Sequence, residues 1–180
     1  MKIADVTADR IEEIAALLVD GFSDTGSAAW RTIEEAIADV RESLEPGRIS
    51  RVAIDDRGEA AGWIGGIEAY EGHVWELHPL VVRRDRRRNG IGRMLVEDLE
   101  AQVALRGGHT ILLGADDESN RTTLGGIDLY PDFLDKLRAI ENRADHPFEF
   151  YRKAGYTVVG AIPDANGFGK PDILMAKRIR

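Results

Sequence analysis

The feature that most constrains the fold is a strand-like stretch that runs directly into an arginine-rich loop with two glycines. Val74–Val82 alternates as a β-strand does, and the eleven residues Arg83–Arg93 carry six arginines together with Gly90 and Gly92. Apolar residues then recur every four positions: Ile91, Leu95, Leu99 and Val103. The order predicts a strand, a glycine turn and a helix over 90–106 in direct succession.

This junction has the chemistry of a phosphate-binding loop. Glycines at a helix start let backbone N–H groups approach an anion, and the helix dipole favours negative charge there. Flanking arginines add charge-assisted contacts to phosphate. The alternative is a solvated basic loop that only caps the helix. A dinucleotide fingerprint needs a third glycine, whereas Arg93-Met94-Leu95 follow here, and a P-loop needs Gly-Lys-Ser/Thr, which is absent.

The rest of the chain alternates between strand and helix patterns. Thr32 and Glu35 have the spacing of a capping box, and Gly155 suits the end of a helix. Early strands pair as hairpins and later ones alternate with helices, which predicts an α/β (α+β) class with a mixed sheet. No repeat or linker interrupts the chain, so we expect a single domain over 1–180. Strands are predicted at 2–6, 49–54, 60–70, 74–82, 110–115, 157–162 and 172–176, and helices from 11, from 32, over 90–106, around 133–140 and over 146–154.

Composition narrows the functional classes. Of the 180 residues 43% are apolar and 31% are charged, which is typical of a globular protein, and the apolar runs are too short to span a membrane. No cysteine is present, which excludes disulfides and thiolate metal sites and suits a cytoplasmic location without a secretory leader. The net charge of −8 predicts no nucleic-acid or membrane partner and favours cationic small molecules.

Several motifs together resemble one superfamily. Arg87-x-x-Gly90-x-Gly92 after a strand resembles the acyl-coenzyme A pyrophosphate loop of the GCN5-related N-acetyltransferases, and the segment 150–156, Phe-Tyr-Arg-Lys-Ala-Gly-Tyr, resembles their closing helix and strand. The stretches 74–82, 113–117, 163–167 and 170–173 resemble the aminoglycoside 6′-N-acetyltransferases, so the resemblance extends from about residue 30 to residue 177.

The resemblance implies a GCN5-related N-acetyltransferase fold, with a mixed and mostly antiparallel sheet flanked by helices. It implies acetyl-CoA as co-substrate, no metal, a homodimer, and transfer to the 6′-amine of aminoglycoside antibiotics, which confers resistance. The alternatives are acetylation of another polyamine or small metabolite amine, and a non-catalytic acyl-CoA-binding sensor.

The resemblance also assigns residues to the coenzyme. The backbone of Leu80, Val81 and Val82 would pair with the pantetheine arm and polarise the thioester carbonyl. Tyr151 would contact the coenzyme and protonate the departing thiolate, with a core aromatic as the alternative. The pyrophosphate would be held by the loop and first helical turn, which comprise Arg87, Arg88, Asn89, Gly90, Ile91, Gly92, Arg93 and Met94.

The chemistry of the acceptor follows from the strand at 74–82. Without a cysteine or a Gly-x-Ser-x-Gly elbow, direct attack by the amine in a ternary complex is the simpler route. Alternation places Val74, Glu76, His78 and Leu80 on one face. Glu76 can hold the ammonium and take its proton through water, or be an ordinary solvent-facing residue. His78 is either catalytic or structural, and strand pairing should break beside Pro79.

Further polar and aromatic residues are candidates for substrate binding. Asp116 and Asp117 follow a buried strand and could bind a polyamine or cap the next segment. Trp30 and Tyr70 could line an aminocyclitol pocket or simply be packed aromatics. The four histidines show no ligand spacing, so no metal site is predicted.

Overall fold

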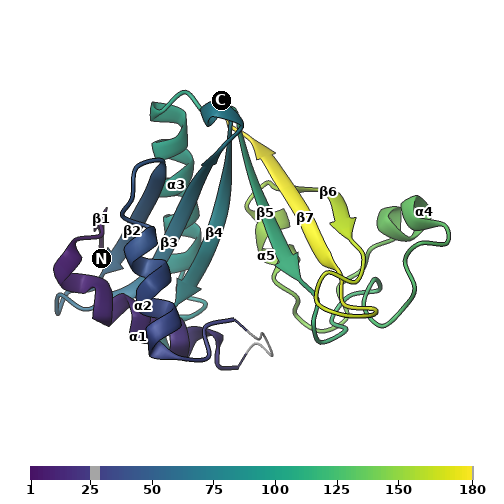
Figure 1. Cartoon of the computed structure of the whole chain (residues 1–180), viewed down its shortest axis with the longest axis horizontal. Coiled ribbons are helices and arrows are strands. Elements are labelled where there is room, and N and C mark those ends of the chain that lie inside the picture. The colour runs from purple at the N-terminus through teal and green to yellow at the C-terminus, as the bar shows by residue number, and fades with distance from the viewer. Residues whose placement is uncertain (25–28, 180) are drawn as a thin grey trace. The chain divides into compact units, whose positions relative to one another are not determined.

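The computed structural model describes residues 1–24 and 29–179, and its seven strands follow the order β1-β2-β3-β4-β5-β7-β6 (Figure 1). The chain divides into two compact units, Met1–Ile111 with the C-terminal end of the chain, and Leu112–Arg178. That the chain acts as a single domain over 1–180 stays a prediction. No helix in the described ranges is long and apolar enough to cross a bilayer.

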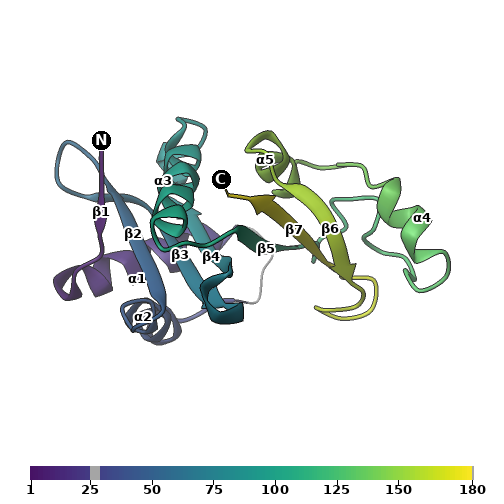
Figure 2. The same ribbon diagram turned by 90° about the horizontal axis from the view of Figure 1, so that it is seen from above.

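The first unit is a four-stranded antiparallel sheet covered on both faces. The strands are β1 (Lys2–Asp5), β2 (Arg48–Ile54), β3 (Ala60–Ala69) and β4 (Val74–Val82), each paired with the next. Figure 2 shows α3 (Ile91–Leu105) over one face and the helices α1 (Ile11–Phe22) and α2 (Ile33–Glu42) over the other. Three short 3-10 turns, at Ala8–Arg10, Tyr70–Gly72 and Arg84–Arg86, complete the unit.

The two faces of this sheet use different side chains. On the α1/α2 face, Trp63 and Val81 of neighbouring strands join a core with Ile14, Leu18 and Val40 of the helices. On the α3 face β3 carries glycine at two positions, because a Cβ on Gly62 or Gly66 would lie within 3 Å of Leu95 or Leu99. Each fully buried leucine of this kind contributes about 1.5–3 kcal/mol by leaving water.

A β-bulge interrupts the pairing of β3 with β4, where a break beside Pro79 was predicted. Ile64 pairs with Leu80 and Gly66 pairs with Leu77, so His78 and Pro79 together oppose the single residue Gly65. Gly65 must be a glycine, since a Cβ there would lie 2.2 Å from the His78 carbonyl oxygen.

The bulge corrects one expectation about β4. Simple alternation placed Leu80 on the same face as Glu76, but the inserted residue reverses the alternation. Leu80 pairs with Ile64, which shares the α3 face with Gly62 and Gly66, whereas Glu76 pairs with Ile67 on the α1/α2 face. Glu76 and His78 therefore share a face that Leu80 does not.

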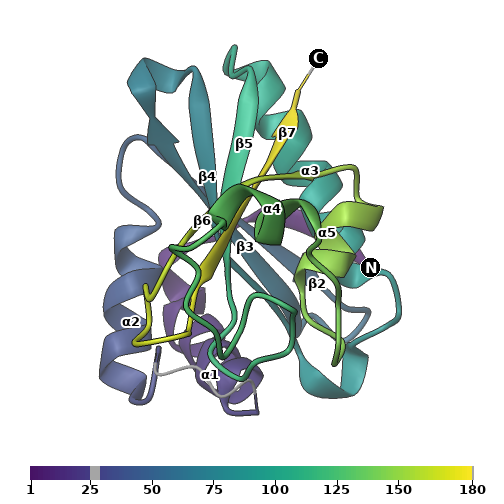
Figure 3. The ribbon, with the colours of Figure 1, turned by 90° about the vertical axis from the view of Figure 1, so that its right-hand side faces the viewer.

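The second unit contains the later strands and two short helices (Figure 3). Its strands are most of β5 (Thr110–Asp116), β6 (Thr157–Ile162) and β7 (Asp172–Arg178), and β6 pairs antiparallel with β7. The helices are α4 (Phe133–Arg138) and α5 (Phe148–Lys153), of which α5 packs on β6 and β7.

The predicted elements and the predicted α/β (α+β) class, with a mostly antiparallel sheet flanked by helices, are confirmed. The capping box is present, because the Thr32 hydroxyl accepts from the Glu35 N–H and the Glu35 carboxylate accepts from the Thr32 N–H. Gly155 has a φ of +92°, as a helix-ending glycine should. The start of α5 differs: it lies at Phe148, not at 146, because the His146 side chain accepts the Phe148 N–H.

Candidate functional site

The loop between β4 and α3 presents backbone amides at a helix start. Arg88 and Gly90 both have positive φ, +64° and +82°, and Gly90 is the residue before the first turn of α3. The N–H groups of the first helical turn have no acceptor within a helix, so they carry partial positive charge toward whatever lies beyond the terminus. The α3 helix has 15 residues and no acidic residue in its first turn, so nothing there opposes an anion.

The arginines of this loop are less available than the sequence suggests. Four of them form ion pairs with acidic residues of the same unit: Arg83 with Asp55, Glu59 and Asp85, Arg84 with Asp20 and Asp24, Arg86 with Asp55 and Asp85, and Arg87 with Asp24.

Arg87 is held by two residues at and just after the end of α1. Its guanidinium donates to the Asp24 carboxylate at 2.9 Å and to the Gly21 carbonyl at the end of α1. Although burial opposes ionisation, the hydrogen bond and charge of Arg87 hold the pKa of the Asp24 carboxyl below its ordinary value. In this geometry Arg87 fastens the loop to α1, and the backbone supplies the anion-binding groups.

Near the end of β4, the backbone N–H and C=O groups of every second residue point away from β3. The Arg83 N–H donates to the Ala61 carbonyl at 3.0 Å, which makes Val82 and Gly62 a pair without mutual hydrogen bonds. In an antiparallel ladder the N–H and C=O of Val81 then face β3, and those of Leu80 and Val82 face away from it. Of the three residues that the resemblance assigns to the pantetheine arm, Leu80 and Val82 therefore have backbone groups that face away from β3, whereas the backbone groups of Val81 pair with Trp63 of β3.

Glu76 and His78 lie on the α1/α2 face of β4. The carboxylate of Glu76 is half-buried and has no hydrogen bond or ion pair with any residue in 1–24 or 29–179. His78 is exposed, and its ring lies 5.6 Å from the ring of Trp30 between centroids. The structure thus brings Trp30 and His78 together, and it leaves a carboxylate free two residues along the strand.

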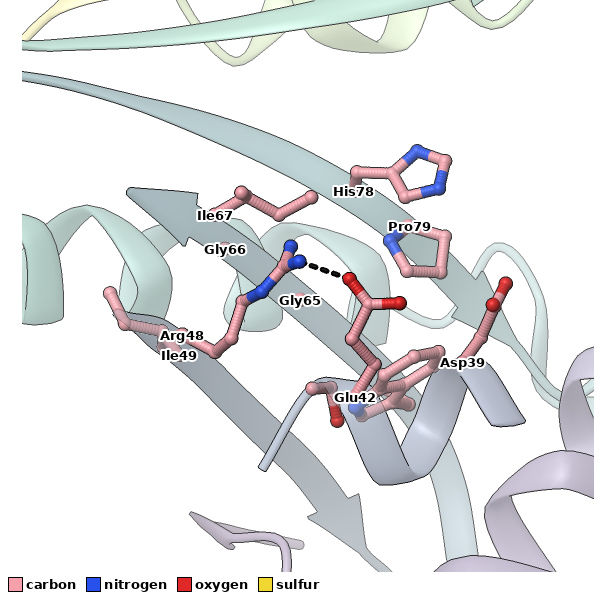
Figure 4. A pocket seen from close by; sticks show the side chains of 11 residues that line it. Asp39, Glu42, Arg48, Ile49, Gly65, Gly66, Ile67, His78 and Pro79 are labelled. Carbon is pink, nitrogen blue, oxygen red and sulfur yellow. Dashed lines mark hydrogen bonds and ion pairs between the residues drawn. The ribbon is translucent and has the colours of Figure 1, made fainter. Parts of the chain in front are cut away.

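A pocket of about 290 Å³ opens beside His78 (Figure 4). Its floor is β2 and β3, one side is His78 and Pro79 of the bulge, and the other side is α2, from which Asp39 and Glu42 reach its rim. Glu42 is paired with Arg48, as the dashed line in Figure 4 marks. The carboxylate of Asp39 accepts the indole N–H of Trp30.

Tyr70 is not part of this cluster. It lies in the turn between β3 and β4, with 75% of its surface exposed and a φ of +49°. Val74, where β4 begins after this turn, is four residues before His78, which is about 13 Å of strand. The structure therefore separates Tyr70 from Trp30.

In the second unit Tyr151 lies on α5, where its ring packs edge-on against Phe150 and Tyr156, with centroids 5.0 and 5.8 Å away. Only 9% of its surface is exposed, and its hydroxyl has no hydrogen bond with any described residue. Burial raises the pKa of the Tyr151 phenol above its ordinary value. The phenol is therefore a protonated group without an internal acceptor.

Asp116 and Asp117 at the end of β5 have different surroundings. Asp116 is exposed, and its carboxylate accepts from the Asn166 amide at 2.5 Å. Asp117 is fully buried, and its carboxylate accepts from the Arg121 N–H, the Thr122 N–H and the Thr122 hydroxyl at 2.6–2.9 Å. This is the capping alternative for Asp117, since a side chain without exposed surface cannot contact a solute.

Sequence reasoning missed His146, which ties β5 to α5. Its Nε2 lies 3.0 Å from the Asp116 carbonyl oxygen, and its Nδ1 accepts the Phe148 N–H at 3.2 Å. Burial lowers the pKa of His146, against the hydrogen bond to Asp116. The signal was a histidine directly before Pro147 and a predicted helix. Asp39 was also missed, because nothing local links it to Trp30.

No group of three or more His, Cys, Asp or Glu side chains is placed to hold a metal ion within residues 1–24 and 29–179. The candidate groups of the first unit are backbone amides, a free carboxylate and an aromatic pair, and the candidate group of the second unit is a protonated phenol.

Comparison with known proteins assigns the family. The model of the acetyltransferase (GNAT) family matches residues 11–130, which contain β4, the arginine loop and α3. The chain belongs to the GNAT family. No curated protein sequence matches significantly. As a GNAT acetyltransferase the chain is an enzyme, and the resemblance found in its sequence is confirmed.

Solved structures similar to this GNAT chain agree with that assignment. The crystal structure of an aminoglycoside 6′-N-acetyltransferase complexed with coenzyme A is 42% identical over 100% of this chain and 98% of its own, with a TM-score of 0.90. The aminoglycoside 6′-N-acetyltransferase from Enterococcus faecium gives the same values. An aminoglycoside 6′-acetyltransferase type Ii is 37% identical over the same shares of both chains, with a TM-score of 0.76.

Proposed function

We propose that this enzyme transfers the acetyl group of acetyl-CoA to the 6′-amine of aminoglycosides by direct attack. The observation that carries the proposal is 42% identity over the whole chain with an aminoglycoside 6′-N-acetyltransferase crystallised with coenzyme A. The acidic surface, with a net charge of −8, supports a polycationic acceptor.

The N-terminus of α3 fits the pyrophosphate of a coenzyme. The amides of Ile91, Gly92 and Arg93 would hold the phosphate oxygens, and the positive φ of Gly90 directs this turn toward them. Arg87 contributes indirectly, by fastening the loop through Asp24.

The backbone groups of β4 that face away from β3 fit the acyl end of the same ligand. Acetyl-CoA supplies the acetyl group as a thioester. The N–H and C=O groups of Leu80 and Val82 face away from β3, so they would hydrogen-bond to the pantetheine arm, and an N–H aimed at the thioester oxygen would stabilise the negative charge that develops there.

Glu76 would hold the ammonium of the acceptor and receive its proton, directly or through water. Its carboxylate has no competing partner in the described chain and lies on the face of β4 where His78 and Trp30 meet. His78 and Trp30 would bind the sugar that carries the amine, and Asp116 would pair with a second ammonium.

Tyr151 would act on the leaving thiolate. A phenol whose pKa is raised stays protonated in neutral solution, and its hydroxyl has no acceptor among the described residues. Because a thiol has an ordinary pKa of about 8.5, the phenol is the weaker acid, so its main contribution is a hydrogen bond to the developing thiolate.

The proposal is tested by following release of coenzyme A thiol from acetyl-CoA. We expect turnover with aminoglycosides that carry a 6′-amine, and none with otherwise similar aminoglycosides that carry a 6′-hydroxyl. Turnover only with linear polyamines or small metabolite amines would show that the substrate is such an amine and not an aminoglycoside. Tight binding of acetyl-CoA without turnover on any amine would indicate a sensor.

The proposal extends to the biological setting. A cytoplasmic enzyme that acetylates these drugs confers resistance, and the absence of cysteine suits a reducing compartment. We also propose a homodimer, on the resemblance to the family. Sedimentation equilibrium tests this, with a mass of twice 19.9 kDa expected. Expression in a sensitive bacterial host should raise the drug concentration needed to stop growth.

A further inference from the structure

We propose that Asp39 is a positioning residue of the acceptor site, which holds the indole of Trp30 in place beside His78. The identity of the acceptor rests on the function proposed above, whereas the contact itself lies within the first unit. The indole N–H of Trp30 donates to the Asp39 carboxylate, nine residues further along the chain. The sequence alone indicates neither a substrate-binding role nor a structural role for Asp39.

Trp30 is constrained on several sides. Its ring packs edge-on against Phe22 with centroids 4.6 Å apart, and the ring of His78 lies 5.6 Å away. Its backbone has a φ of +52°, a region that bulky residues rarely adopt and that persists only where the surroundings over-determine it. Such conformations cluster where a side chain must be held for a ligand.

The α2 helix holds Trp30 through both its backbone and its side chain. The Glu35 carboxylate accepts the N–H of Arg31, the residue directly after Trp30, at 3.1 Å and also completes the capping box. Asp39, on the second turn of α2, then fixes the indole. The α2 helix therefore holds both the backbone next to Trp30 and the indole ring itself.

The position of Asp39 connects this contact to the acceptor pocket. Asp39 lines the pocket of about 290 Å³ together with His78 and Pro79, as Figure 4 shows. Trp30 does not line this pocket itself, but its ring lies 5.6 Å from the ring of His78, which does. An aromatic ring that is already fixed loses little freedom when a ligand packs on it, so binding is stronger. An indole also attracts a cationic acceptor through its π face. Asp39 should therefore lower the KM for the acceptor without touching the reacting atoms.

The experiment compares two variants. Asp39→Leu removes the carboxylate that accepts the indole hydrogen bond and keeps the side-chain size, whereas Asp39→Asn keeps an oxygen for the indole N–H. Acrylamide quenching of tryptophan emission in the free enzyme reports Trp30, because Trp63 and Trp75 are only 1% and 3% exposed. We expect more quenching in Asp39→Leu and nearly wild-type quenching in Asp39→Asn.

Kinetics supply the second measurement. In Asp39→Leu the KM for the aminoglycoside should rise about tenfold, the size expected for one lost hydrogen bond to a charged group, with an unchanged KM for acetyl-CoA. Asp39→Asn should recover most of this. Glu34→Leu is the control: it removes one negative charge from the same helix and should leave both KM values unchanged.

Three results would overturn the inference. One is wild-type quenching and KM in a folded Asp39→Leu, and another is an equal rise of KM in Asp39→Asn, which would make the charge itself the binding group. If Asp39→Leu does not fold, the KM is measured for Asp39→Ala, for Trp30→Phe and for the double variant. The third overturning result is that the two substitutions change the KM additively, because residues that act through one contact should not. A wild type that acetylates no aminoglycoside contradicts the proposed function, while quenching still decides whether Asp39 holds Trp30.

Discussion

Glu76 is a carboxylate whose role depends on what surrounds it on β4. It pairs across the sheet with Ile67, and two residues further on the bulge turns His78 and Pro79 toward α2. The carboxylate has no partner in the described chain to neutralise it or to hold it in one rotamer. It is therefore available to an ammonium.

Replacement of Glu76 by Gln tests that role, since the amide keeps the shape and removes one charge. If Glu76 mainly binds the ammonium, the KM for the acceptor should rise with turnover little changed. If it is the base, turnover should fall by about 10²–10⁴ and the ascending acid limb of the wild-type pH profile should disappear. Wild-type kinetics at every pH would show that Glu76 is an ordinary strand residue.

Tyr151→Phe removes one hydroxyl from a packed ring. We expect the midpoint of thermal unfolding to be unchanged or slightly higher, because the hydroxyl has no hydrogen bond in the described chain to lose. Turnover should fall by about 10²–10⁴ if the hydroxyl stabilises the leaving thiolate. Because burial raises the pKa of Tyr151, the wild-type kcat/KM should show no descending limb from this group up to pH 10, its ordinary pKa. Parallel loss of stability and activity would favour a core aromatic.

At the scale of elements, α3 joins the sheet to the proposed anion site. Gly92→Asp adds a carboxylate to its first turn, where the helix dipole stabilises negative charge by about 0.3–1 kcal/mol. The variant should therefore fold as stably as the wild type. Its affinity for acetyl-CoA should fall at least about tenfold, because two like charges near contact repel by more than a kcal/mol.

Calorimetric titration with acetyl-CoA measures this affinity. Ala101→Asp is the matched control, since it adds the same charge to an exposed position near the other end of α3. Equal affinities in Gly92→Asp and the wild type would remove the assignment of the pyrophosphate to this loop.

The junction of β5 and α5 predicts a pH-dependent stability. His146 is neutral when it accepts the Phe148 N–H, and burial lowers its folded pKa below the ordinary 6.5. The unfolded chain then binds the proton more readily, so the stabilisation is present above pH 6.5 and is lost as the pH falls toward the folded pKa. The free energy of unfolding should fall by up to about 1.4 kcal/mol per pH unit from this group.

Denaturant unfolding between pH 7.5 and 5 measures the effect. The change in the free energy of unfolding per pH unit should be smaller in His146→Gln than in the wild type. It should persist in His78→Gln, because His78 is exposed. An unchanged slope in His146→Gln would assign the acid sensitivity to other groups.

The elements themselves were predictable because their signals are local. The apolar spacing of α3 and the capping box at Thr32 depend on residues three or four positions apart. The effect of the bulge was not predictable in full. Pro79 predicted a break in pairing. The reversal that moves Leu80 to the α3 face, however, depends on which residue of β3 lies opposite His78 and Pro79, here Gly65.

At the scale of the whole molecule, the charge of −8 should act on substrate association. Aminoglycosides are polycations, and salt screens exposed charges beyond about 10 Å at 0.1 M. The KM for the aminoglycoside should therefore rise as potassium chloride is increased from about 50 to 500 mM. The KM for a singly charged amine acceptor is the control and should change less. An aminoglycoside KM that is independent of salt would contradict an electrostatic contribution.

The sequence by itself determined the order of the elements, the glycine turn before α3 and the acidic balance, because each depends on neighbouring residues or on composition alone. Only the tertiary structure decided that acids at and just after the end of α1, and acids of the β2–β3 hairpin, neutralise the loop arginines. It also decided that Asp117 is buried and that Asp39 holds Trp30. These contacts join residues on different elements, and the geometry of packing, which no local pattern encodes, sets which charges meet and which remain free.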